Sequence, residues 1–205
     1  MAVTINGDGV VDVGGNSSSA AKVRLYEDSD NGTNYIDLIA PASVASNRTI
    51  TLPDVTGTLL TTATAGTVLQ VVQATTSTEV TTSSAAPTYV DTGLSASITP
   101  SSASSKILVC VNHGTVTKSA GNANNRIFLR LLRGSTEISL FGNGLNYTAT
   151  ALQVRSSASF AYLDSPATTS STTYKTQFAN GDPAAEVQVQ TNSSMSSIIL
   201  MEIAA

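Results

Sequence analysis

The segment "SKILVCVNHGTVT" at residues 105–117 holds the most continuous apolar run of the chain, at 108–111, and "SIILMEIA" at 197–204 holds a second one. Short apolar runs bounded by turn residues are typical of strands that are covered by other layers. We therefore expect both segments to be central strands covered on both faces. Cys110 is the one cysteine of the chain, and a lone thiol in an apolar strand predicts a small core residue. We expect this strand to end at His113.

Further short segments of alternating apolar and polar residues surround these two. The turns "RGS", "FGNG", "NGDP" and "TNSS" separate them, at intervals close to the roughly 8 to 12 residues that are typical of sandwiches and jelly rolls. No stretch has a sustained period of 3.6 with good helix formers. The fold class predicted is all-β, with an antiparallel, jelly-roll-like β-sandwich as a C-terminal head domain at 66–205.

The composition excludes two classes of partner. Charged residues make up 12% of the chain and the net charge is −4, so no basic stripe is present to neutralise a phosphate backbone, and we expect no nucleic acid as a ligand. No apolar run approaches the roughly 18 residues of a membrane helix, so we expect no membrane insertion. Serine, threonine, asparagine and glycine, rather than charged residues, are expected to make the surface hydrophilic.

Residues 21–65 predict a β-hairpin and a collar. "KVRLYE" and "NYIDLIA" alternate on either side of Asn31-Gly32, a dipeptide that favours tight hairpin turns. "RTITLPDVTGTLLT" at 48–61 predicts two more short strands, which Pro53 separates because it cannot donate a ladder hydrogen bond. The apolar residues of this module are too few to close a core, so we expect them to meet identical chains or the downstream domain. They are Ile36, Leu38, Ile50, Leu52, Leu59 and Leu60.

Residues 1–20 predict an extended anchoring arm. Glycines interrupt its apolar residues Val3, Ile5, Val10 and Val11, and a Gly-Gly-Asn-Ser-Ser-Ser cluster follows as a flexible joint. An arm of this composition is expected to dock on another protein.

Few residues carry chemistry. With one histidine in the chain, we expect neither a hydrolytic triad nor a multi-histidine metal site. Asp28 and Asp30 are spaced as in a calcium loop, but no glutamate closes the loop, so a hairpin turn is favoured. Asp164 and Asp182 stand beside turn residues and are expected to cap backbone amides, although a glycosidase pair remains an alternative for them. We expect no cofactor and no enzymatic activity.

A candidate receptor loop lies in "FGNGLNYTAT" at 141–150. Asn143 and Asn146 offer hydrogen bonds and Tyr147 offers a stacking face for a sugar. The alternative for the same residues is an ordinary turn.

The segment "GTNYIDLIAPASVASNRTITLPDVTGTLLTT" at 32–62 closely resembles a module of tail-fibre and other virion structural proteins of tailed bacteriophages, especially those of marine and cyanobacterial hosts. "YVDTGLSASITPSSASSKILV", "FLRLLRGSTEI", "YLDSPATTSSTTYKTQ" and "SIILMEIAA" resemble the C-terminal head domain that often follows this module. The resemblance covers about residues 31–205. It implies a homotrimer in which the collar segments intertwine and the β-sandwiches form a threefold head.

The function that the resemblance implies is structural. The chain is expected on the virion surface as a short homotrimeric fibre or knob, which the arm anchors to another tail or capsid protein and whose head serves host attachment. The chain has almost no shaft, unlike a long host-recognition fibre. Two alternatives are therefore kept: a capsid decoration protein, of the cement or head-fibre kind, and a carbohydrate-binding adhesin module that recognises a host surface glycan.

Overall fold

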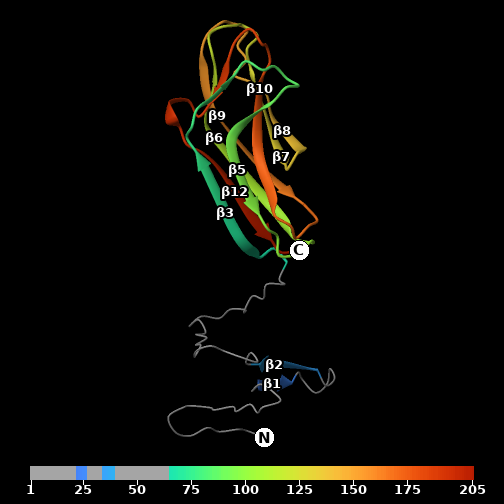
Figure 1. Ribbon diagram of the computed structural model, residues 1–205. Helices are drawn as coiled ribbons and strands as arrows, with labels where there is room; N and C mark the ends of the chain where they lie inside the picture. Colours follow the sequence, from blue (N-terminus) through green and yellow to red (C-terminus); the bar gives the residue numbers. More distant parts are fainter. Residues whose placement is uncertain (1–21, 27–33, 40–64) are drawn as a thin grey trace, which may run out of the picture. The chain divides into compact units, whose positions relative to one another are not determined.

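The computed structural model of the chain describes residues 22–26, 34–39 and 65–205 (Figure 1). The chain divides into two compact units, residues 1–58 and 59–205, and each is described by itself. Several predicted features lie outside the described residues. They are the arm with Val3, Ile5, Val10 and Val11, the turn with Asp28 and Asp30, and the collar residues Ile50, Leu52, Leu59 and Leu60.

The first unit contains the predicted hairpin strands. β1 (Lys22–Tyr26) pairs with β2 (Tyr35–Ile39) in antiparallel register, with Lys22 opposite Ile39 and Tyr26 opposite Tyr35. Alternating side chains on paired strands share a face. The sequence alternation therefore gives this ribbon one mainly charged and aromatic face and one apolar face.

The second unit is all-β, which confirms the predicted fold class. Its elements are β3 (Val68–Thr76), β4 (Val80–Thr82), β5 (Val90–Ile98), β6 (Lys106–Lys118), β7 (Ile127–Arg133), β8 (Thr136–Leu145), β9 (Val154–Asp164), β10 (Thr172–Asn180), β11 (Val187–Val189), the short 3-10 turn η1 (Thr191–Ser193) and β12 (Ser196–Ile203). In the part of the chain that is described, no helix has the length and apolarity needed to cross a membrane.

Two antiparallel sheets form a sandwich (Figure 1). One has the order β5-β10-β7-β8. The other has the order β3-β12-β6-β11-β4, and β9 pairs with β6. The predicted central position of residues 105–117 and 197–204 is confirmed, because β12 lies between β3 and β6, and β6 lies between β12 and β9.

Two details of the predicted central strand are wrong. On β6, Ile107 and Val109 are buried, but Leu108 and Cys110 on the opposite face are only half-buried, so Cys110 is not the predicted core residue. β12 alternates between buried and half-buried residues in the same way, so neither strand is covered on both faces. The reason is that β6 belongs to one of two layers, so the other sheet covers a single face. The strand also continues through His113 to Lys118, with an irregularity in its pairing to β9 just after the histidine.

The core consists of two apolar clusters. The larger joins both sheets through Leu94, Leu131 and Tyr174 on one side and Val109 and Ile198 on the other. The second contains Val116, Ile127, Leu129, Phe178, Val187 and Val189. Side chains from facing sheets interdigitate in this way in aligned sandwiches.

Candidate functional site

The hairpin has an exposed apolar face. Val23, Leu25, Ile36 and Leu38 share this face by register, and their exposed fractions run from 44% to 68%. Ile36 and Leu38 are the two predicted collar residues that the structure describes, and both lie on it. Side chains of this size and exposure on a two-stranded ribbon leave apolar surface in water, which a partner would cover.

On the opposite face of the hairpin, charged side chains of the two strands pair with each other. Arg24 Nε and Nη2 donate to the two carboxylate oxygens of Asp37 at 2.6 and 2.7 Å, and the Arg24 guanidinium lies 3.4 Å from the centre of the Tyr35 ring. Lys22 Nζ lies 3.3 Å from Asp37. The hydrogen bond from Arg24 lowers the pKa of Asp37 to about 2. The two faces of the hairpin therefore differ. On one face the charged groups of Arg24 and Asp37 are paired, and on the other the apolar side chains are exposed.

The predicted turn at "FGNG" is wrong, because residues 141–144 belong to β8 and the loop begins only after Leu145. Part of the predicted receptor loop makes internal hydrogen bonds. Asn146 Nδ2 donates to the carbonyls of Val116 and Val154, and Asn146 Oδ1 accepts from Ser156 Oγ at 2.8 Å. Asn146 therefore ties the end of β8 to β6 and β9, in a left-handed conformation with φ 62°. Asn143 is exposed on β8, and Tyr147 is 51% exposed with Arg126 5.9 Å from its ring centre.

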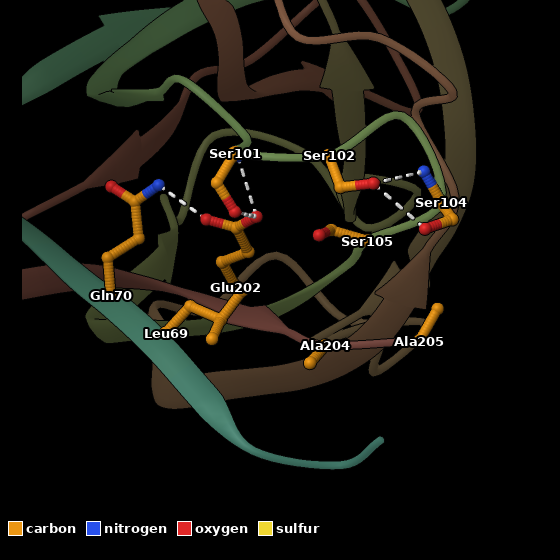
Figure 2. Close-up of a pocket in the computed structure, with 9 residues that line it drawn as sticks. All are labelled: Leu69, Gln70, Ser101, Ser102, Ser104, Ser105, Glu202, Ala204 and Ala205. Atoms are coloured by element: carbon orange, nitrogen blue, oxygen red, sulfur yellow. Dashed lines mark hydrogen bonds between the residues drawn. The ribbon is translucent and has the colours of Figure 1, made fainter. Parts of the chain in front are cut away.

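A serine-lined pocket of about 690 Å³ lies at the C-terminal end of β12 (Figure 2). Glu202 is its one acidic lining residue, and Figure 2 shows it between Gln70 and Ser101. Gln70 Nε2 donates to Glu202 Oε2 at 2.6 Å, and the backbone N–H and hydroxyl of Ser101 both donate to Oε1 at 2.7 Å. Burial acts to raise the pKa of Glu202, but these hydrogen bonds outweigh it and lower the pKa to about 2.

The Glu202 contacts have a structural consequence. Gln70 Nε2 also donates to the Thr99 carbonyl at 2.7 Å, so one carboxylate joins β3, β12 and the loop between β5 and β6. Sequence reasoning missed this residue. A usable signal existed, because Glu202 has the same parity as the inward residues Ile198 and Leu200, and a charged residue at an inward position needs dedicated partners.

Asp164 joins the two sheets instead of capping a turn, so the predicted capping role is wrong for this residue. It ends β9, is buried, and accepts from Arg133 Nη1 at 2.8 and 2.9 Å and from Tyr174 Oη at 2.6 Å. The turn residues that follow Asp164 in sequence suggested a local cap, whereas its partners lie on strands of the other sheet. Burial, and then the bond to Asp164, raise the pKa of Tyr174 above its usual range. Asp182 does cap a backbone amide, that of Ala184 at 3.0 Å.

His113 is the centre of a buried polar seam. Its Nε2 lies 3.2 Å from Thr176 Oγ1 and its Nδ1 lies 3.4 Å from Gln190 Nε2. Because the Gln190 amide nitrogen donates, Nδ1 is the acceptor and the ring proton is on Nε2. Thr176 continues the seam to Thr92 at 2.6 Å. Burial lowers the pKa of His113 to about 4, so the ring is neutral at pH 7, and its nitrogens are engaged inside the fold.

In the described ranges, no group of three or more His, Cys, Asp or Glu side chains is placed to hold a metal ion. The surfaces that stand out are the apolar hairpin face and the serine-lined pocket around Glu202.

Comparison with protein-family models gives no match for this chain, and comparison with curated proteins gives none either.

Proposed function

We propose that this chain is a structural virion protein of a tailed bacteriophage, a short homotrimeric fibre or knob that is anchored by its N-terminal arm and presents the β-sandwich for host attachment. The observation that carries the proposal is the apolar hairpin face formed by Val23, Leu25, Ile36 and Leu38. The sequence resemblance of residues 31–205 to phage appendages supplies the kind of assembly. The particle surface is the expected location, and another virion protein is the expected partner of the arm.

The reasoning from the hairpin is energetic. At about 25 cal/mol per Å² of buried apolar area, covering even a few hundred Å² per chain contributes several kcal/mol before the entropy of association is subtracted. The opposite face keeps its charges paired through Arg24 and Asp37. Identical chains can therefore meet through the apolar face without breaking an ion pair.

The oligomer is tested by light scattering on the full chain. The native protein is expected at three times the chain mass of 21.0 kDa, and Ile36→Asp and Leu38→Asp are expected to lower that mass while circular dichroism still reports a folded sandwich. Leu152→Asp is the matched control, because Leu152 is 46% exposed but lies outside the hairpin. A monomeric native chain, or an unchanged trimer in both hairpin variants, would refute the proposed assembly.

The place on the particle is tested by imaging purified virions labelled with an antibody to residues 66–205. Label at the tail supports the fibre or knob. Label distributed over the shell supports the alternative of a capsid decoration protein, and unlabelled virions with a working antibody contradict both.

A carbohydrate-binding adhesin is the second candidate, and the exposed Asn143 and Tyr147 favour it. A glycan array is the test. Binding that Tyr147→Ala abolishes supports the adhesin, and an array without any bound glycan at high protein concentration removes it.

A further inference from the structure

The six-stranded sheet has an outer face, turned away from the other sheet, that is more apolar than an ordinary solvent face. We define the outer face by the residues whose side chains alternate with the buried ones along four adjacent strands. They are Val71, Gln73 and Thr75 on β3; Ser197, Ile199, Met201 and Ile203 on β12; Lys106, Leu108, Cys110 and Asn112 on β6; and Ser159, Ala161 and Leu163 on β9.

The pairing register arranges these side chains in rows across the strands. Val71 is opposite Met201, Met201 is opposite Leu108, and Leu108 is opposite Leu163. This row is apolar from one edge of the sheet to the other, and its end members Val71 and Leu163 are 58% and 50% exposed. Large apolar side chains at both ends of one row form a ridge that crosses the sheet.

A groove follows the ridge. The next row contains Ile199, Cys110 and Ala161, and the one after it contains Ser197, Asn112 and Ser159. Small side chains make this region a hollow of about 410 Å³, which Cys110, Ala161, Ser159, Ser197 and Ile199 help to line. Ridge and groove are thus adjacent on one surface, so a neighbouring copy meets both large and small apolar side chains there.

The charge of the outer face argues against a charged partner. Lys106, at one end of β6, is its one ionisable group besides the Cys110 thiol. A surface of this kind cannot select a phosphate backbone or an anionic membrane by charge. It can meet a copy of itself without like-charge repulsion, which would otherwise cost free energy.

The two edges of the outer face are also complementary. β3 has β12 as its ladder partner and β9 has β6, so each presents an unpaired backbone edge among the described residues. The successive pairings are antiparallel, so β3 and β9 run in opposite directions. Rotation about an axis along the strands therefore places β9 of one copy antiparallel to β3 of the next. β3 has no charged side chain, and the charged residues of β9, Arg155 and Asp164, lie near its two ends. Long edge strands of this kind are ready templates for such pairing.

The area of the outer face limits how much of an interface between copies it can form. Four strands spaced about 4.8 Å apart and about 25 Å long cover an outer face of roughly 500 Å². A standard interface buries about 800 Å² per partner. The outer face is therefore large enough to contribute an interface between copies but too small to be the whole of a stable one.

We propose that the outer face of the β3-β12-β6-β9 sheet is the surface through which the head domains of neighbouring copies meet, with the ridge of Leu108, Leu163 and Met201 turned towards the threefold axis. This inference rests on the proposed homotrimer. Beyond the homotrimer itself, the inference states that the head domains contact one another through a defined sheet face, so that the hairpin is not the sole interface.

Cys110 provides the probe, because it is the one thiol of the chain and lies in the groove. The full native chain is compared with Leu163→Glu by light scattering and by the rate at which a small aromatic disulfide reagent modifies the thiol. The native trimer is expected to react at least about tenfold more slowly than Leu163→Glu, since RT ln 10 corresponds to a modest contact of about 1.4 kcal/mol. Leu152→Glu, outside the outer face, is expected to match the native rate.

The outcomes separate the two proposals. A native trimer whose Cys110 reacts as fast as in Leu163→Glu overturns the outer-face contact and leaves the hairpin trimer standing. A monomeric native chain overturns both. Val71→Glu, at the opposite end of the ridge, replaces Leu163→Glu if circular dichroism shows that the latter is unfolded, and the same rates then decide.

Discussion

The hairpin and the sandwich use the same sequence device with opposite results. In the sandwich, alternation places Val109, Leu131 and Ile198 between two sheets, where they are buried. In the hairpin, the same alternation places Ile36 and Leu38 on a face where they are 68% and 59% exposed. The difference teaches that alternation determines which side chains share a face, whereas burial depends on a second layer. A module that has no such layer among the described residues is a candidate for assembly.

The strongest test of this contrast is removal of one leucine from each region. Leu131→Ala empties a fully buried site in the core cluster that also contains Val109 and Tyr174, and we expect the free energy of unfolding of the sandwich to fall by about 2 to 5 kcal/mol. Leu25→Ala, at a 54% exposed hairpin site, is expected to change it by less than about 0.5 kcal/mol. Denaturant unfolding followed by circular dichroism measures both, and equal effects would contradict the contrast.

The second test uses pH and concerns His113 in the sandwich. The folded chain keeps the imidazole neutral down to about pH 4, whereas the unfolded chain binds the proton near pH 6.5. The unfolded state binds more protons between these values, so the free energy of unfolding is expected to fall by about 3 kcal/mol as pH decreases from 6.5 to 4.

The pH test has an internal control. His113→Gln is expected to be less stable at pH 7 but nearly flat over the same window, because the amide does not titrate. The contribution of Glu202 to the free energy of unfolding is lost at lower pH, between its ordinary pKa of 4.5 and its folded-state pKa of about 2. A native chain whose stability is constant from pH 6.5 to 4 would show that His113 is not held neutral.

The third test breaks the link between the sheets. Asp164→Ala removes the acceptor of the buried Tyr174 hydroxyl and the partner of Arg133, and we expect a loss of about 2 kcal/mol in the free energy of unfolding. Tyr174→Phe in the same background should recover part of this loss, since it removes the unpaired hydroxyl. Strictly additive losses in the double variant would argue against the contact.

The smallest effect is expected in the hairpin and is electrostatic. NMR titration of the Asp37 carboxyl should give a pKa near 2 in the native chain, and Arg24→Gln should move it towards 3.8 because the largest lowering cause is lost. The melting temperature of the sandwich should not change, since exposed ion pairs contribute little. A pKa of 3.8 in the native chain would mean that the Arg24–Asp37 pair does not form in solution.

The alternation pattern predicted the strands well. The hairpin, the strands of the sandwich and the absence of long helices in the described ranges all follow from the period of two and the turn residues. The weaker predictions concern contacts between residues far apart in sequence. Asp164 was predicted to cap a backbone amide because turn residues follow it. It instead accepts hydrogen bonds from Arg133 and Tyr174 across the sandwich.

By itself, the sequence determined the strand class, most of the turn positions and the two faces of each strand, because these depend on local backbone geometry and on the spacing of apolar residues. The tertiary structure decided which face each layer covers. It buried Ile107 and Val109 but left Leu108 and Cys110 half-buried on the same strand, and it brought Glu202 to Gln70 and Ser101. Such choices depend on how strands distant in sequence pair and on how the sheets stack, and local spacing does not encode either.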